Sequence, residues 1–326
     1  MGSEQQIKVP PSGIWAPAIT FFDNDQLTLD AQAKYYAYLS RTGLAGLVIM
    51  GTNGETFLLT AEERATLIAT ARKAVGPSFP IMAGCGAHST AQVLGHIADA
   101  AAAGADYALV LPPAYFGKAT TPAVVERFFD AVAARSPLPI VIYNFPAVTN
   151  GVDLDSDLIA RLAARHRNIV GVKLTCGSVA KVVRLSAALP RDRFATFGGQ
   201  SDFLLGALAS GAAGCIAAFA NIAPRTVVKI YDLYGAGKVE EALALHQKAA
   251  LAENPCKAGI ATVKFVAATY TARRAGIEGA ERIAVPREPY GEPAEAAKKA
   301  TLEALVEIQA IEEELVKAAA AAAAAA

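Results

Sequence analysis

Eight short apolar segments, separated by longer amphipathic stretches, constrain the fold of this chain more than any other feature. Each segment is brief, rich in β-branched residues and bounded by Gly or Pro, so we predict a β-strand at each one. The segments begin near Ile14–Thr20, Gly46–Met50, Pro80–Ala83, Tyr107–Leu111, Pro139–Tyr143, Ile169–Leu174, Phe194–Phe197 and Gly214–Ala217. The intervening stretches have helical periodicity, for example Thr60–Val75, Thr90–Gly104, Thr121–Ala134 and Asp155–Arg165.

Strand–helix units that repeat eight times, with strands apolar on both faces, predict a closed parallel (β/α)8 TIM barrel over residues 13–237. The alternative is an open doubly wound sheet, which usually carries a glycine-rich phosphate loop after its first strand. Here the first strand is followed by Thr20-Phe-Phe-Asp-Asn24, which argues against the open sheet.

The pattern changes after the eighth unit, where the chain becomes almost entirely helical. The expected helices are Val239–Ala252, Cys256–Gly276 and Glu292–Lys317. We predict a helical extension over residues 238–317 that packs against the barrel. It brings no cluster of catalytic residue types, so we do not interpret it as a separate chemical module. Residues 1–12 are a tail, and the alanines 318–326 carry no chemistry.

The charge balance limits the classes of ligand. Lys plus Arg and Asp plus Glu both number 30 in 326 residues, which gives no electrostatic reason to expect nucleic acid or an anionic membrane. No apolar run reaches the roughly 18 residues of a membrane span, and the start lacks the apolar region of a signal peptide. Four widely spaced cysteines are typical of reduced thiols inside the cell. We therefore expect a cytoplasmic protein with a small-molecule partner.

Lys173 is the sharpest chemical signal. It lies in Ile-Val-Gly-Val-Lys-Leu, residues 169–174, an otherwise apolar predicted strand. A buried ammonium is costly, so such a lysine becomes neutral or finds a partner. A neutral amine is a good nucleophile toward a carbonyl group. Because the C-terminal ends of barrel strands face the active site, we favour a nucleophile over a lysine that merely extends to solvent.

Tyr143 ends the preceding predicted strand, in Ile-Val-Ile-Tyr-Asn-Phe-Pro, residues 140–146. A phenol beside a lysine can transfer protons during imine formation and C–C cleavage. A tyrosine at a strand end can also be a packing residue. Its place one strand before Lys173 favours the catalytic role.

Two loops and the histidines complete the candidate site. The loop Gly51-Thr-Asn-Gly-Glu55 has glycines that let backbone N–H groups converge on a carboxylate, with the side chains of Thr52 and Asn53 beside them; an ordinary turn is the alternative. Gly198-Gly-Gln-Ser-Asp202 reads by itself as a turn. The four histidines lack metal-ligand spacing, so we predict no metal site and no metal-dependent aldolase.

Together these motifs resemble the family of dihydrodipicolinate synthase, N-acetylneuraminate lyase and the 2-keto-3-deoxy sugar acid aldolases. Five motifs match in order, from about Ile14 to the C-terminal helices: Gly51-Thr-Asn-Gly-Glu55, Leu111-Pro-Pro-Ala-Tyr115, Tyr143-Asn-Phe-Pro146, Gly171-Val-Lys173, and Gly199 followed by Gly214-Cys-Ile216.

The resemblance implies a class I mechanism that needs no cofactor, because Lys173 itself forms an imine with the C2 carbonyl of pyruvate. It implies that Tyr143 moves the protons and that Thr52 and Tyr115 complete its relay, with Tyr115 supplied by a neighbouring subunit of a homodimer or homotetramer. Thr52 and Asn53 would hold the pyruvate carboxylate.

The same resemblance places three residues around the substrate. Thr175 would meet its C4 hydroxyl, and Gly199 and Ile216 would line the site with backbone.

One departure from the family bears on the substrate. Dihydrodipicolinate synthases carry an arginine two residues after the proline of the tyrosine motif, where this chain has Val148. Losing that charge-assisted contact would cost about 1.5–3 kcal/mol. Gln200-Ser201 also replaces an acidic pair that is common after the glycine.

The Thr-Asn loop and Pro146-Ala-Val-Thr are closest in look to fungal L-threo-3-deoxy-hexulosonate aldolases and eukaryotic 4-hydroxy-2-oxoglutarate aldolases. We therefore favour cleavage of a 2-keto-3-deoxy sugar acid to pyruvate and an aldehyde such as glyceraldehyde.

Three alternatives remain open. The first is 4-hydroxy-2-oxoglutarate aldolase, which yields pyruvate and glyoxylate and needs a cation for the distal carboxylate that the sequence does not locate. The second is dihydrodipicolinate synthase, which Val148 disfavours. The third is a non-catalytic keto-acid binder, whose expected mark is the loss of the lysine or the tyrosine.

Overall fold

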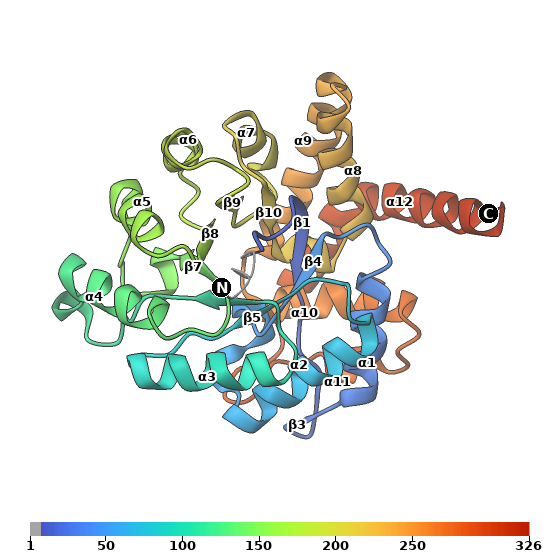
Figure 1. Cartoon of the computed structure of the whole chain (residues 1–326). Helices are drawn as coiled ribbons and strands as arrows, with labels where there is room; N and C mark the ends of the chain where they lie inside the picture. The colour runs from blue at the N-terminus through green and yellow to red at the C-terminus, as the bar shows by residue number, and fades with distance from the viewer. Residues whose placement is uncertain (1–7, 326) are drawn as a thin grey trace.

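Eight parallel strands close into a barrel in the computed structural model, which describes residues 8–325 (Figure 1). The order around the barrel is β1-β10-β9-β8-β7-β6-β5-β4. The strands are β1 (Gly13–Pro17), β4 (Gly46–Ile49), β5 (Ile81–Gly84), β6 (Tyr107–Val110), β7 (Ile140–Asn144), β8 (Ile169–Leu174), β9 (Ala195–Gly198) and β10 (Gly214–Ile216). The predicted (β/α)8 barrel is thus confirmed, with all eight strands where the apolar segments lie.

Helices follow the strands and surround the barrel. They are α1 (Leu29–Leu39), α2 (Ala61–Val75), α3 (Thr90–Ala102), α4 (Pro122–Ala133), α5 (Ser156–Arg165), α6 (Val179–Ala188), α7 (Leu204–Ala209) and α8 (Pro224–Gly235). Short 3-10 turns occupy several loops: η1 (Thr52–Gly54), η2 (Thr56–Leu58), η3 (Gly117–Ala119), η4 (Pro146–Val148) and η5 (Ala218–Asn221). A small hairpin, β2 (Phe22–Asp23) and β3 (Gln26–Leu27), lies between β1 and α1.

The first strand is shorter than we predicted, since β1 ends at Pro17 rather than at Thr20. Beyond Pro17 the backbone turns toward other partners. The N–H of Ile19 donates to the side chain of Asn221 at 3.3 Å, and the hydroxyl of Thr20 donates to the carbonyl of Gly54 at 2.8 Å. The residues after the strand are therefore buried loop, tied to the neighbouring loops at the mouth of the barrel.

Side chains fill the interior of the barrel. Trp15 is fully buried there and makes edge-to-face contacts with Tyr107 and Phe197, with ring centroids 6.2 Å apart in each case. A Cβ on Gly46, in the neighbouring strand β4, would come within 2.3 Å of the Trp15 ring. The glycine lets the indole occupy the barrel axis, so this end is a packed core rather than a channel.

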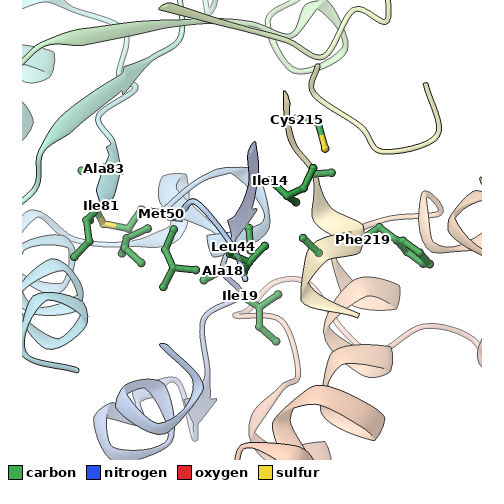
Figure 2. Packing of buried hydrophobic residues seen from close by; sticks show 14 of the residues in the cluster. Ile14, Ala18, Ile19, Leu44, Met50, Ile81, Ala83, Cys215 and Phe219 are labelled. Carbon is green, nitrogen blue, oxygen red and sulfur yellow. The ribbon is translucent and has the colours of Figure 1, made fainter. Parts of the chain in front are cut away.

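A second apolar layer fills the space between the strands and the helices. Figure 2 shows part of it, with Ile14 and Ala18 near Leu44, and Ile81 near Met50. Ile14 is 1% exposed and Ile81 is fully buried. Burial on both faces explains why the strands read as continuous apolar runs.

The C-terminal extension contains α9 (Val239–Cys256), α10 (Ile260–Ala267), the π-helical turn η6 (Ala268–Ala272), α11 (Ala280–Ile283) and α12 (Glu295–Ala325). Helix α12 packs on α8, α9 and α10 and then projects away from the barrel, drawn in red in Figure 1. Helix α9 runs past its predicted end at Ala252. The next helix begins at Ile260 rather than at Cys256, because Gly259 there has a φ of 150°.

One buried carboxylate attaches the extension to the barrel. Glu312 of α12 is fully buried and accepts hydrogen bonds from the N–H of Arg225 at 3.1 Å and from the N–H and hydroxyl of Thr226 at 2.7 Å each. These N–H groups lie in the first turn of α8, where a negative charge is favourable. This contact fixes the position of α12 on α8.

Candidate active site

Lys173 and Tyr143 are neighbours because of strand register. They lie on adjacent strands, β8 and β7, and their Cα atoms are directly paired. Lys173 is 2% exposed and Tyr143 is 4% exposed. Both are close to the C-terminal ends of their strands, which is the end where barrel active sites form.

An irregularity in the same strand pair turns Lys173 inward. The register shifts between Ile140 and Val141 of β7. Val170 faces the barrel interior, whereas Val172 packs in the outer layer against the helices. Strict alternation from Val170 would turn Lys173 outward, but the shift reverses the alternation, as a β-bulge does.

The side chains of Lys173, Tyr143 and Thr52 form a hydrogen-bonded chain. The ammonium or amine Nζ of Lys173 donates to the phenol oxygen of Tyr143 at 3.1 Å. That oxygen is 3.3 Å from the hydroxyl of Thr52, at the start of η1. Nζ also lies 4.2 Å from the centroid of the Tyr143 ring. A proton can therefore pass between the lysine and the tyrosine without a large movement.

A cavity of about 680 Å³ opens over this chain. Its floor and one wall come from the strand ends and the loops after them, including Thr52, Tyr143 and Lys173. The C-terminal extension supplies the remaining lining residues: Glu253, Cys256, Lys257, Ala258, Gly259, Ile260, Ala261, Val263, Pro286, Tyr290 and Gly291. A site of this size accommodates a small metabolite.

Three more of the predicted residues line the cavity: Asn53, Thr175 and Gly199. Gly199 touches Thr175 so closely that a Cβ on the glycine would lie 2.0 Å from the threonine hydroxyl oxygen. That hydroxyl is buried and has no hydrogen-bond partner among the described residues. A buried polar group of this kind is costly unless a ligand satisfies it.

The other two predicted residues lie outside the cavity wall. Ile216 is fully buried in the barrel interior and is not among the residues that line the cavity. Tyr115 is 73% exposed and does not reach Tyr143 within this chain. Its ring lies beside Phe116 and His88, with centroids 5.4 and 5.9 Å away.

Sequence reasoning missed the two charged residues that the extension brings to the cavity. Glu253 is 3% exposed. One of its carboxylate oxygens accepts a hydrogen bond from the N–H of Ser201 at 3.3 Å, and the other accepts from the hydroxyl of Ser201. Burial raises the pKa of Glu253 to about 7. Lys257 directly follows Cys256, the last residue of α9, and it pairs with Asp202. Neither residue belongs to a recognisable motif.

The interpretation of the extension therefore needs a correction. It is not a separate chemical module, but it supplies many of the residues that line the cavity. Cys256 is one of these residues, and burial raises the pKa of its thiol to about 12. A thiol that stays protonated at neutral pH is a poor nucleophile.

A buried ion pair fixes the loop that carries Thr52. Glu55 accepts a hydrogen bond from Lys264 of α10, and both side chains are at most 1% exposed. The other carboxylate oxygen of Glu55 accepts from the N–H of Arg287 at 2.8 Å. The ammonium of Lys264 also donates to the carbonyl of Val285 at 2.9 Å. The extension thus holds the loop in place as well as closing the cavity.

Two further findings concern residues 8–325. No group of three or more His, Cys, Asp or Glu side chains in this range has the arrangement of a metal site. No helix in the same range is both long and apolar enough to cross a membrane.

The fold and the paired Lys173 and Tyr143 define a class of protein: a (β/α)8 barrel with a polar site at the C-terminal ends of its strands, where barrel enzymes bind their substrates. A model of the dihydrodipicolinate synthetase family matches residues 10–309. The chain belongs to the dihydrodipicolinate synthetase family, and it is a carbon–carbon lyase of the pyruvate-dependent aldolase type. The resemblance seen in the sequence motifs is thus confirmed.

Two individual relatives and one solved structure are similar to this chain over most of its length. A Coccidioides immitis (strain RS) protein named "Putative 4-hydroxy-2-oxoglutarate aldolase, mitochondrial" is 65% identical over 307 residues, 94% of this chain and 98% of the relative. A Hypocrea jecorina protein named "L-threo-3-deoxy-hexylosonate aldolase" is 41% identical over 274 residues, 80% of this chain and 87% of the relative. A crystal structure of a dihydrodipicolinate synthase family protein from Coccidioides immitis matches with a TM-score of 0.90 and 62% identity, covering 94% of this chain and 99% of that chain.

Proposed function

We propose that this aldolase acts through an imine between Lys173 and the C2 carbonyl of a 2-keto acid. The amine of Lys173 adds to the carbonyl carbon, and loss of water leaves the imine. Tyr143 removes the proton of the C4 hydroxyl, the C3–C4 bond breaks, and its electron pair moves to the protonated imine nitrogen as an enamine. Protonation at C3 and hydrolysis then release pyruvate and the free lysine.

The observation that carries this mechanism is the hydrogen bond between Lys173 and Tyr143 at the floor of the cavity. The distance of 3.1 Å is short enough for direct proton transfer. Thr52 contacts the same phenol and extends the relay. A non-catalytic keto-acid binder would not need the tyrosine and the lysine in this arrangement, so we do not favour it.

Around the imine, the substrate contacts follow from the lining residues. Thr52 and Asn53 would hold the carboxylate of the pyruvate moiety. Thr175, whose hydroxyl has no partner among the described residues, would bind the C4 hydroxyl. Gly199, whose missing side chain leaves room for Thr175, would line the site with backbone.

For the substrate itself, we propose 4-hydroxy-2-oxoglutarate, which is cleaved to pyruvate and glyoxylate. The Coccidioides immitis relative with that activity in its name covers nearly the whole chain at 65% identity. The sugar-acid aldolase that the sequence favoured is the second candidate, supported by the 41% identical Hypocrea jecorina relative. The relatives thus support the 4-hydroxy-2-oxoglutarate aldolase better than the sugar-acid aldolase. Val148, which lines the cavity, argues against dihydrodipicolinate synthesis.

The homo-oligomer and the cellular compartment stay predictions. The exposed ring of Tyr115 lies beside Phe116 and His88, and His88 stacks on the exposed ring of Phe57. These rings form a surface suited to a second copy of the chain. The name of the Coccidioides immitis relative includes a mitochondrial location, whereas we predicted the cytoplasm.

Borohydride trapping with pyruvate, followed by peptide mapping, tests the mechanism. We expect a stable adduct on Lys173 that disappears in Lys173→Ala and persists in Lys248→Ala, an exposed lysine on α9. An adduct on another lysine, or none, would overturn the imine. A turnover assay with 4-hydroxy-2-oxoglutarate and a 2-keto-3-deoxy hexonate then decides between the two substrates.

A further inference from the structure

Positive charge is scarce in the cavity. Among the described residues that line it, Lys173 and Lys257 are the two with a basic side chain. Lys173 is committed to the imine in the proposed reaction. A second negatively charged group on the substrate would therefore have Lys257 as its cationic partner.

Lys257 is held in position by the end of α9. It caps the C-terminus of that helix, and its N–H donates to the carbonyl of Asn254 at 3.1 Å. A cation is favourable at this end of a helix. Its ammonium pairs with Asp202 and donates to the side-chain oxygen of Gln200 at 3.3 Å. The side chain is 30% exposed, so it is ordered by contacts yet open to a ligand.

Lys257 and Gln200 retain hydrogen-bond donors that an anion could accept from. An ammonium has three donors, and Asp202 and Gln200 account for two of them. Because the oxygen of Gln200 accepts from Lys257, its NH2 group remains a donor. Gln200 and Lys257 line the cavity, whereas Asp202 does not. Asp202 and Gln200 thus hold the ammonium in place, and the remaining donors belong to Gln200 and Lys257, two residues that line the cavity.

A series of neighbouring residues connects Lys257 to Lys173, where the substrate would react. Thr175 lies two residues after Lys173, directly after the end of β8, and packs against Gly199. Gln200 follows Gly199 directly, and its side chain contacts Lys257. A substrate that extends from the imine past Thr175 would bring its far end to Gln200 and Lys257.

We propose that Lys257, together with Gln200, binds the second carboxylate of a dicarboxylic 2-keto acid and so determines substrate specificity. This inference rests on the proposed function, because it presumes that the substrate is anchored at Lys173. Glu253 shares the cavity wall, and burial raises its pKa to about 7. Near neutral pH it is protonated in part of the molecules, which reduces its repulsion of the incoming carboxylate.

A matched pair of keto acids tests the proposal without turnover. 2-Oxoglutarate and 2-oxopentanoate have the same five-carbon chain, but only the first has a carboxylate at C5. The concentration for half-maximal borohydride trapping is measured for each ligand, and their ratio reports the C5 carboxylate alone. In the unmodified protein we expect trapping to favour 2-oxoglutarate. In Lys257→Met the ratio should fall by about 10- to 100-fold, the loss of one charge-assisted contact.

Two further variants separate charge from packing. Lys257→Arg keeps a cation and should retain most of the preference, whereas Lys248→Met, a lysine elsewhere on α9 that pairs with Glu307, should leave it unchanged. An equal loss of trapping for both keto acids in Lys257→Met would make the lysine a structural part of the wall and overturn the proposal. An unchanged ratio would overturn it as well.

The experiments distinguish a failure of the proposed carboxylate site from a failure of the proposed function. If the protein prefers 2-oxoglutarate in trapping but does not cleave 4-hydroxy-2-oxoglutarate, the proposed substrate is wrong and the carboxylate site stands. If it cleaves that substrate and Lys257→Met raises neither KM nor the trapping concentration for 2-oxoglutarate, the site is wrong and the function stands.

Discussion

Replacing Glu253 with glutamine should change how the stability of the protein depends on pH. Burial raises the pKa of this carboxyl group from the ordinary value of 4.5 to about 7 in the folded state. The folded protein therefore holds the proton more strongly than the unfolded chain does. The resulting stabilisation is fully present below pH 4.5 and is lost as the pH rises through about 7.

The magnitude follows from the shift in pKa. A shift from 4.5 to about 7, at roughly 1.4 kcal/mol per pH unit, gives about 3 kcal/mol across the window. Glutamine does not titrate, so Glu253→Gln should lose this decline. The free energy of unfolding of the variant minus that of the unmodified protein should increase with pH by about 3 kcal/mol. A constant offset from altered contacts with Ser201 does not affect the slope.

Urea unfolding at several pH values between about 5 and 8 measures this difference, and other titrating groups largely cancel between the two proteins. Ser201→Ala provides a second, signed test. The hydroxyl of Ser201 lowers the pKa of Glu253, so its removal should extend the decline to higher pH. A difference between Glu253→Gln and the unmodified protein that stays flat over the window would refute the reasoning.

Three further changes have defined outcomes. Lys264→Met should destabilise the fold by about 3–5 kcal/mol in urea unfolding, because Glu55 loses its buried partner; the double variant with Glu55→Gln should recover most of the loss. Gly199→Ala should abolish or strongly reduce pyruvate trapping, since its Cβ would lie 2.0 Å from the Thr175 hydroxyl; Gly206→Ala, where the nearest atom is 3.9 Å away, is the control. If a partner subunit supplies Tyr115, Tyr115→Phe should lower kcat about 100-fold without changing the mass in light scattering, and an unchanged kcat would exclude the shared relay.

The barrel was predictable because it depends on a pattern that eight segments repeat. Parallel strands covered on both faces must be apolar along their whole length, so each segment stands out in the sequence. The ends of the elements depend on individual contacts instead. The backbone after Pro17 bonds to side chains such as Asn221, which is distant in the sequence, so the end of β1 could not be read from local residues.

The inward orientation of Lys173 could not be predicted from the alternation of residues along its own strand. Counting alternate residues from Val170 turns the lysine away from the interior, and the register shift in β8 reverses this. At Gly171 the strand runs close to β9, since a Cβ there would lie 2.6 Å from the carbonyl oxygen of Ala195. The residue types and their positions at strand ends predicted that Lys173 and Tyr143 lie together, and the structure brings them into contact. The direction of the Lys173 side chain depends on a bulge that the sequence pattern does not show.

The extension was harder to interpret because its contribution comes from tertiary contacts. From the sequence, Lys264 is an ordinary helical lysine, yet it is fully buried and pairs with Glu55, which is distant in the sequence. Glu253 likewise lies in a long amphipathic helix and approaches Ser201 only when α9 packs beside the barrel. Such residues become recognisable as site residues only when the two segments are brought together.

The two halves of the site differ in how strongly the fold constrains them. Lys173 and Tyr143 are buried and paired by strand register, so a change there disturbs the barrel itself. Lys257 is held by a helix cap and by a partly exposed ion pair with Asp202. Ion pairs of that kind contribute about 0–1 kcal/mol to stability. On the proposed mechanism, a change at Lys257 should alter which substrate is accepted while leaving the fold and the imine chemistry intact. The extension is then the part of this protein in which specificity can vary with the least effect on stability.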